Sequence, residues 1–222
     1  MKIFSNIILI FLVISIMLVT PVYADNTVKA NTLYELGLFR GTDTGYELDK
    51  TLTREQAVTI LVRLLGEEEN VLNARFDKKF IDVDDSRWSY PYIMYCYENS
   101  ITKGTGDDTF SPEDEVTAEQ FVTLVMRLMG YEDIEPENAL TQSVYIGMLN
   151  TEVVRDLEKS ENFLRDDMVY VVYRSLMCNM SDRTRFADFL AEKGVITEKE
   201  AKQFDVYESS DDIDDLLVQL LG

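Results

Sequence analysis

The stretch that decides the fold runs from Phe80 to Gly130 and reads FIDVDDSRWSYPYIMYCYENSITKGTGDDTFSPEDEVTAEQFVTLVMRLMG. Its first part, WSYPYIMYCYENSI, is predicted to be a helix, because Pro91 falls in the opening turn, where backbone amides have no intrahelical partner. A turn-rich loop follows. The last part predicts an amphipathic helix that begins at Thr117, has Gln120 at the capping-box position and ends at Gly130. The stretch therefore predicts a helix-loop-helix unit.

The same unit occurs upstream and, in a weaker form, downstream. Residues 33–66 repeat its second helix 64 positions earlier, with Arg54 where the central unit has Ala118. Residues 145–177 keep the apolar helix face and have Arg165 at that position, but their loop has lost its glycine and its aromatic residue. Three such units predict an all-α array in which each unit buries its apolar face against its neighbours.

Several motifs follow one another in a fixed order, most of them in the central unit. They are Phe-x-Asp-Val, Trp, Tyr-Ile, a glycine-rich loop, Phe-x-Pro and Thr-Arg-Glu before an amphipathic helix, found at Phe80, Asp82, Val83, Trp88, Tyr92, Ile93, Phe110, Pro112, Thr53, Arg54 and Glu55. This order resembles the S-layer homology (SLH) repeat of bacterial surface proteins over roughly residues 31–177. The resemblance implies a pseudo-threefold helical domain that binds a secondary cell-wall polysaccharide, often one bearing a pyruvate ketal.

The fold is thus expected to be all-α, with three helix-loop-helix SLH-type repeats in a pseudo-threefold domain, a C-terminal helical hairpin and a tail. The expected segments are a signal peptide (1–24), SLH-like repeat 1 (25–66), SLH-like repeat 2 (76–131), a degenerate SLH-like repeat 3 (134–178), the hairpin (182–207), and an acidic linker with an apolar tail (208–222). The tail is expected to pack on its own domain or, alternatively, to bind a protein partner.

The first 24 residues have the pattern of a secretory signal. Lys2 precedes an apolar run from Ile7 to Val19, and the residues before Asp25 fit cleavage after Ala24. The alternative is an uncleaved anchor, which would be the one contact with a membrane, although the run is short for a membrane span. We therefore expect a secreted protein attached to the cell wall or cell surface.

Composition excludes several classes of function. The chain has 21 basic and 41 acidic side chains, a net charge of −20, which argues against nucleic acid as a partner. It has no histidine, which excludes Ser-His-Asp and Cys-His catalysis and the usual zinc sites. Cys96 and Cys178 are expected to be small buried hydrophobes, with a disulfide after export as the alternative. We expect no metal and no cofactor.

Candidate ligand-binding residues lie at the starts of the second helices. Thr53 is expected to cap its helix and Glu55 to complement the helix dipole, but Arg54 opposes that dipole at a cost of up to about 1 kcal/mol. A bound anion would reverse this cost, and free amides beside a guanidinium suit a carboxylate such as a pyruvate ketal. An anionic polysaccharide would need such local cations, because the acidic chain repels it at long range. The alternative is that Arg54 is an ordinary surface side chain.

The other repeats differ at this position. Arg165 supplies the cation in repeat 3, whereas Ala118 leaves repeat 2 without one, so we expect at most two competent grooves, the first being the better. Trp88 is expected either to stack on a sugar ring or to pack between repeats. Asp82 is expected either to accept hydrogen bonds from sugar hydroxyls or to cap the helix that contains Trp88.

The resulting hypothesis is a non-catalytic module that binds an anionic secondary cell-wall polysaccharide and anchors itself or a partner at the wall. A second hypothesis is a cell-surface protein-interaction scaffold whose repeats no longer bind sugar, which Ala118 and the degenerate third repeat favour. A third, an enzyme that uses paired carboxylates as glycosidases do, has little support because no pair of acids stands out.

Overall fold

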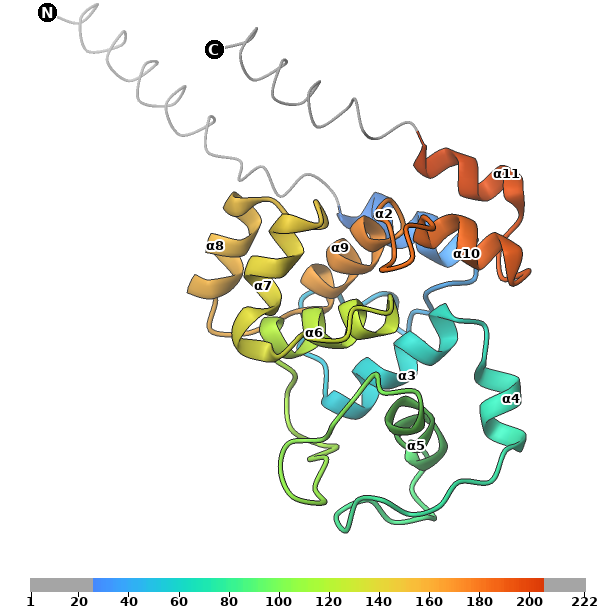
Figure 1. Ribbon diagram of the computed structural model, residues 1–222, viewed down its shortest axis with the longest axis vertical. Coiled ribbons are helices and arrows are strands. Elements are labelled where there is room, and N and C mark those ends of the chain that lie inside the picture. Colours follow the sequence, from blue (N-terminus) through green and yellow to red (C-terminus); the bar gives the residue numbers. More distant parts are fainter. Residues whose placement is uncertain (1–25, 206–222) are drawn as a thin grey trace, which may run out of the picture.

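The computed structural model describes residues 26–205, which form an all-α fold with no β-strand among them (Figure 1). The elements are α2 (Asn26–Glu35), α3 (Arg54–Leu64), α4 (Glu68–Asn73), α5 (Tyr90–Glu98), α6 (Ala118–Leu128), α7 (Pro136–Tyr145), α8 (Thr151–Lys159), α9 (Arg165–Ser175), α10 (Phe186–Glu192), α11 (Glu198–Ala201) and the 3-10 helix η1 (Lys202–Phe204). The predicted fold class is confirmed. The predicted signal peptide (1–24) and the predicted tail (208–222) lie outside the described residues.

Local sequence signals set the starts and ends of α3 and α6. Thr53 and Thr117 each accept a hydrogen bond from the backbone amide of the glutamine three residues later, whose side chain accepts one from the threonine amide in return. Glycines in the left-handed region follow these helices, Gly66 at φ 69° and Gly130 at φ 85°. A capping box at one end and a glycine at the other therefore limit both helices to 11 residues.

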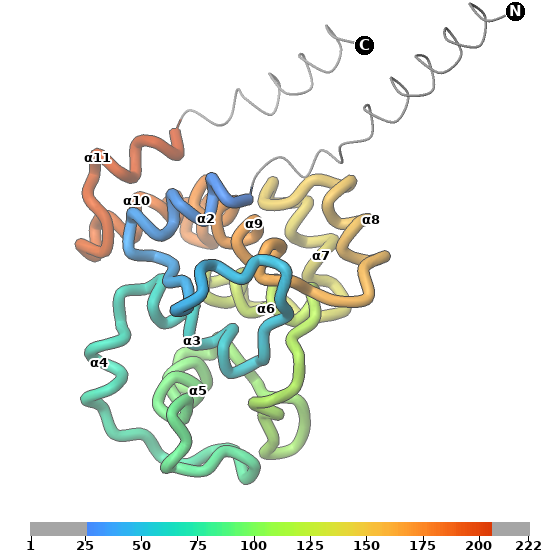
Figure 2. The backbone as a smooth tube through the Cα atoms, turned by 180° about the vertical axis from the view of Figure 1, so that it is seen from behind, coloured from blue at the N-terminus to red at the C-terminus, as the bar shows by residue number. Residues whose placement is uncertain are grey.

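The helices close into a ring with pseudo-threefold symmetry. The second helices of the three repeats, α3, α6 and α9, lie at the centre, where α6 contacts both of the others (Figure 1). Each first helix packs on the second helix of the preceding repeat: α5 on α3, α7 on α6, and α2 on α9. The last of these pairs brings the start of the described chain against its third repeat, as the blue and orange segments in Figure 2 show, and so closes the ring.

The core lies between these helices. Its fully buried apolar side chains include Val58, Leu61, Ile93, Phe121, Val122, Val125, Met168, Val169 and Val171. Cys96 and Cys178 are free thiols buried in the same core, as the prediction of small hydrophobes required, and they do not form the alternative disulfide. Burial raises the pKa of Cys178 to about 11, so this thiol is unreactive at neutral pH.

Repeat 3 differs from the sequence-based expectation of a degenerate loop. Where the other repeats have a glycine-rich loop, it has α8, whose start is capped by the Asn150 side chain accepting from the Val153 amide at 2.8 Å. Without glycine or proline to interrupt it, the segment forms a helix and buries Val154 and Leu157. The prediction of a loop at this place was wrong.

The C-terminal elements α10, α11 and η1 cover the ends of the central helices. The Ser181 amide donates to the Met129 carbonyl at the end of α6, and Lys193 pairs with Glu67 just after α3. The Thr197 side chain caps α11 by accepting a hydrogen bond from the Glu200 amide. Within residues 26–205, none of the helices has the length and apolar character needed to cross a bilayer.

Candidate functional site

The start of each second helix is the point where two repeats meet. The backbone amides of Arg54 and Glu55 donate to carbonyls in the loop of repeat 2, those of Asp114 (2.9 Å) and Pro112 (3.1 Å). In the same way, the Arg165 amide donates to the Lys50 carbonyl of repeat 1 at 2.8 Å. The loop of one repeat thus satisfies amides at the start of a neighbouring helix, which otherwise lack partners.

The arginine side chains at these two helix starts make matching contacts. Arg54 Nε donates to the Phe110 carbonyl at 2.8 Å, and its guanidinium lies 4.8 Å from the centre of the Phe110 ring. Arg165 Nε donates to the Tyr46 carbonyl at 2.9 Å, and Tyr46 lies 64 positions before Phe110. Burial lowers the pKa of both guanidiniums, but arginine remains charged at neutral pH.

These contacts correct two expectations about Arg54. Its side chain is not on the surface, since only 5% of the residue is exposed. It also needs no bound anion to offset the helix dipole, because the Phe110 carbonyl and ring and a 3.1 Å hydrogen bond from Nη1 to Gln120 Oε1 stabilise the charge. The dipole argument therefore does not by itself indicate a ligand.

A cleft of about 180 Å³, here called the cationic cleft, lies beside Arg54. It is lined by Arg54, Thr102, Gly104, Thr105, Gln120, Thr123, Leu124, Arg127 and Pro136. The Arg127 guanidinium is held by the Ile134 carbonyl (Nε, 2.9 Å) and by the Glu135 carboxylate (Nη2, 2.7 Å). Two fixed guanidiniums, three threonines and an amide thus line one cleft, and this set can bind a carboxylate together with hydroxyl groups.

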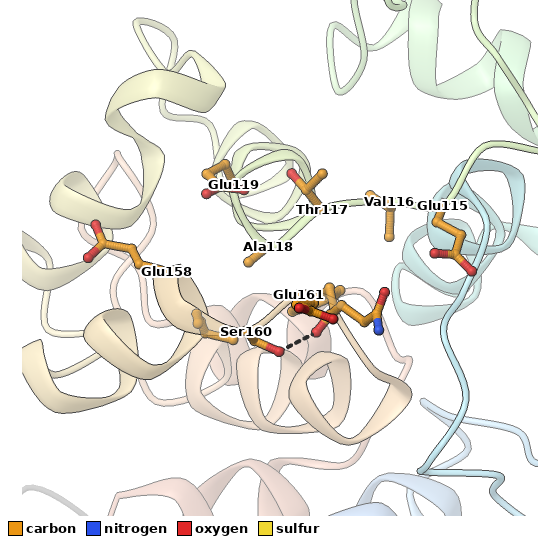
Figure 3. Close-up of a pocket in the computed structure, with 11 residues that line it drawn as sticks. Glu115, Val116, Thr117, Ala118, Glu119, Glu158, Ser160 and Glu161 are labelled. Atoms are coloured by element: carbon orange, nitrogen blue, oxygen red, sulfur yellow. Dashed lines mark hydrogen bonds between the residues drawn. The ribbon is translucent and has the colours of Figure 1, made fainter.

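A second cleft, of about 200 Å³, lies at the start of α6 and is here called the acidic cleft (Figure 3). It is lined by Glu115, Val116, Thr117, Ala118, Glu119, Leu157, Glu158, Ser160, Glu161, Asn162 and Phe163. Figure 3 shows Ala118 directed toward the loop that carries Ser160 and Glu161. The lining has four carboxylates and no basic side chain, so this cleft repels anions. Although it is the larger of the two, it does not suit an anionic ligand.

The Glu55 carboxylate lies away from the cationic cleft, in an interaction with the loop before α5. It accepts hydrogen bonds from Arg87 Nε (2.7 Å), Arg87 Nη2 (3.0 Å) and the Ser89 hydroxyl. Burial alone would raise the pKa of Glu55, but the hydrogen bonds from Arg87 and Ser89 outweigh it and lower the pKa. Glu55 therefore connects α3 of repeat 1 to repeat 2.

Comparison with known proteins matches one segment of the chain to a family. The S-layer homology domain family matches residues 79–122, which include α5, the glycine-rich loop and the start of α6. The match to this family covers about a fifth of the chain. The matched segment is the central repeat, in agreement with the resemblance seen in the sequence.

Several relatives of this chain have names that place them at the cell wall or cell surface. The chain is 34% identical over 110 residues to the middle cell wall protein of Brevibacillus brevis, and 35% identical over 109 residues to the surface layer protein of Brevibacillus choshinensis. Each match covers 49% of this chain and 10% of the relative. It is 30% identical over 84 residues to the cellulosome-anchoring protein of Acetivibrio thermocellus, covering 38% of this chain and 19% of that protein. The chain thus spans a small part of these relatives, and together they indicate a location at the cell surface.

The other predicted site residues of the SLH repeats lie in different places. Asp82 does not cap the helix of Trp88: its carboxylate accepts hydrogen bonds from the amides of Phe110 (2.9 Å) and Ser111 (2.7 Å) and so holds the loop beside Arg54. Trp88 is 54% exposed, with its ring centre 6.2 Å from that of Tyr92. Neither Asp82 nor Trp88 lines the cationic cleft.

Sequence analysis missed the second arginine of the cationic cleft. Arg127 repeats Arg63 at the spacing of 64 residues, but it stands in the last turn of an SLH helix, where a basic residue is explained by the helix dipole. Its position became clear only when the structure placed α7 against α6. The 64-residue repetition was the signal that could have drawn attention to it.

Proposed function

We propose that this chain is a non-catalytic cell-surface module that binds an anionic secondary cell-wall polysaccharide in the cationic cleft. By doing so it anchors itself, or a partner, at the cell wall. The observation that carries this proposal is the pair of guanidiniums, Arg54 and Arg127, that line one cleft of a chain whose net charge is −20. An acidic protein can bind an anionic polymer only where such local cations outweigh its overall repulsion.

The lining of the cleft supports a carbohydrate with a carboxylate group. Guanidinium groups bind carboxylates through charge-assisted hydrogen bonds, and a pyruvate ketal presents one carboxylate on a sugar ring. The exposed Thr105 hydroxyl can donate to or accept from a sugar hydroxyl, whereas the Thr102 and Thr123 hydroxyls are buried and bonded to backbone groups. A cleft of this size suits one or two sugar units, with the rest of the polymer in solvent.

The predicted site residues take different roles in this proposal. Arg54 contacts the ligand, while Thr53 and Glu55 position Arg54 by fixing the start of α3. Asp82 positions the loop beside the cleft through its hydrogen bonds to two loop amides. Trp88, which is largely exposed, stacks on a further part of the polymer, and Arg165 forms a weaker second groove at the interface between repeats 3 and 1.

The contacts of two carboxylates support an anchoring role over a catalytic one. The buried Glu55 carboxylate accepts hydrogen bonds from Arg87 and Ser89, and the Glu68 carboxylate accepts them from Arg63 and Tyr92. Neither carboxylate is therefore available for proton transfer. The printed name of the Acetivibrio thermocellus relative, a cellulosome-anchoring protein, supports the idea that such a segment attaches a partner to the cell surface.

Co-sedimentation with cell walls tests the proposed function. The chain from Asp25 to Gly222 is mixed with purified walls of the organism that produces it, before and after mild removal of the secondary polysaccharide. Sedimentation that is lost with the polysaccharide supports the proposal. Equal sedimentation with stripped and intact walls, or none with either, contradicts it and favours a protein-interaction scaffold.

The scaffold hypothesis has one observation in its favour. At the interface of repeats 2 and 3, Ala118 replaces the arginine and the acidic cleft is present instead of the inter-repeat contacts made by Arg54 and Arg165. One of the three interfaces is therefore unsuited to an anionic sugar, whatever the other two bind.

A further inference from the structure

The cationic cleft is bordered by a carboxylate of the chain itself. Glu135, directly before the lining residue Pro136, pairs through one oxygen with Arg127 Nη2 at 2.7 Å and through the other with Lys103 Nζ. The Arg127 side chain is only 7% exposed, whereas those of Lys103 and Glu135 are 60% and 48% exposed. The Glu135 carboxylate thus joins a buried cation that lines the cleft to an exposed cation at its rim.

A similar arrangement occurs just after α3, where the carboxylate of Glu68 also accepts a hydrogen bond from the Tyr92 hydroxyl. There the Glu68 carboxylate lies between Arg63 Nε (2.7 Å) and Arg40 Nη1 (2.8 Å). Arg40 and Lys103 each stand directly before the matched loop glycine, and Arg63 and Arg127 are 64 positions apart.

The two acids, however, are not at matching positions in the sequence. The residue 64 positions after Glu68 is Glu132, whereas Glu135 makes the contact in repeat 2. Two unrelated acids thus occupy equivalent places, which indicates that the pair of cations selects a carboxylate at this point, whichever segment supplies it.

We propose that Glu135 occupies, in the empty protein, the place that a carboxylate of the ligand takes when the cationic cleft is filled. Arg127 and Lys103 then exchange the internal carboxylate for an external one, and Glu135 turns toward solvent. This inference rests on the proposed function and adds Arg127, Lys103 and Glu135 to the residues that set the affinity and specificity of the cleft.

The physical conditions for such an exchange are present. Ion pairs with a half-exposed partner are weak, because water screens them, so Glu135 can be displaced at little cost. While it is in place, Glu135 neutralises one of the cations and shields the cleft from weakly bound anions. A ligand also loses translational and rotational freedom on binding, so it competes with Glu135 through the further contacts it makes with Arg54 and the rest of the cleft, and a carboxylate fixed on a sugar ring keeps its own ordering cost small.

Removing the Glu135 charge tests the proposal. Glu135→Gln is compared with Glu137→Gln, an exposed acid in the first turn of α7, the helix that Glu135 directly precedes, and both variants make the same change in net charge. Isolated wall polysaccharide is titrated into each full chain by calorimetry. We expect Glu135→Gln to bind about two- to fivefold more tightly than Glu137→Gln, as the loss of an exposed competing ion pair predicts. Equal or weaker binding by Glu135→Gln overturns the proposal.

A measurement on the unaltered chain does not depend on the variant folding. Contacts with Lys103 and Arg127 lower the pKa of the Glu135 carboxyl in the empty protein. If the ligand displaces Glu135, carbon-13 NMR should show that this pKa rises toward its ordinary value when polysaccharide is added. An unchanged pKa in the complex overturns the exchange while the proposed function stands, whereas a polysaccharide that binds neither wild type nor Glu135→Gln defeats both.

Discussion

Arg54 Nε donates to the carbonyl of Phe110 at 2.8 Å, although the two residues are 56 positions apart and belong to different repeats. The same bond joins Arg165 to Tyr46, and the two acceptors occupy equivalent positions in their loops. The arginine that follows the capping threonine in repeat 1 therefore has a structural role, which is to hold the loop of the next repeat against its own helix. Any role in ligand binding is added to that one.

The first prediction is that both arginines stabilise the fold to a similar extent. Arg54→Ala and Arg165→Ala each leave a loop carbonyl without its donor and remove a contact with an aromatic ring, so each should lower the free energy of unfolding by about 2–4 kcal/mol. Urea unfolding measures this. The exposed Arg155 of α8 is the control, and its change to alanine should cost less than about 0.5 kcal/mol. An Arg54→Ala variant as stable as Arg155→Ala would refute the structural role.

The second prediction concerns the interface that lacks an arginine. Ala118→Arg would extend a guanidinium into the acidic cleft, where four carboxylates repel one another, and should raise the free energy of unfolding by about 0.5–1 kcal/mol. Ala118→Leu, which fills space without charge, is the control and should not give this gain. Thermal unfolding in low salt compares the two. A lower melting temperature for Ala118→Arg than for Ala118→Leu would show that the carboxylates are not the important feature of the cleft.

The third prediction is a dependence of stability on pH that comes from Glu55. Its pKa is lowered in the folded protein, so its ion pair with Arg87 contributes stability above the unfolded pKa, near 4.5, and loses it as the pH falls through the folded value. At pH 7, Glu55→Gln should cost about 1–3 kcal/mol, because a charged hydrogen bond is lost in a buried site.

Unfolding by urea at several pH values between 7 and 3 measures this effect. The difference between wild type and Glu55→Gln should be constant down to about pH 5 and should shrink below about pH 4.5. Comparing the two chains removes the contribution of the other acids, which titrate in both. A difference that does not change between pH 7 and pH 3 would contradict the assigned role of the carboxylate.

The fourth prediction concerns the loop beside the cationic cleft. Gly104 has φ +89°, and a Cβ atom there would clash with the Thr109 carbonyl oxygen and lie 2.7 Å from the Phe80 ring. Gly104→Ala should therefore cost about 3 kcal/mol or more, through backbone strain and a clash together. Gly147, with φ +74° and open space around it, is the matched control, and its change to alanine should cost about 1 kcal/mol. Equal losses in the two variants would show that the clash is relieved by movement of the loop.

Local signals allowed much of the fold to be predicted. The capping boxes at Thr53 and Thr117 and the glycines after their helices depend only on residues within a few positions of each other, so the sequence contains them in full. The degenerate third loop was predicted wrongly because α8 is defined by the absence of loop signals, with Asn150 as its cap. The missing glycine was interpreted as a sign of a weakened loop, whereas its absence allows this segment to form a helix.

The site was harder to predict because its residues come from different repeats and meet only when those repeats pack together. Sequence analysis selected Arg54, but its acceptor on Phe110 and its neighbour Arg127 come from repeat 2, and the arrangement could not be read from spacing alone. Glu55 and Asp82 were selected with Arg54, and the structure connects both to the elements around it, Glu55 through Arg87 and Asp82 through the loop amides.

The measurement that tests the central claim most directly is a calorimetric titration of isolated wall polysaccharide into wild type, Arg54→Ala and Arg165→Ala. Both variants lose a hydrogen bond to a loop carbonyl and a contact with an aromatic ring, and Arg54→Ala also loses the bond to Gln120, so circular dichroism and urea unfolding establish that each is folded. If the cationic cleft binds the polymer, Arg54→Ala should lose about ten- to a hundredfold in affinity, as expected for a charge-assisted hydrogen bond, and Arg165→Ala should lose less. Wild-type affinity in Arg54→Ala would contradict the account.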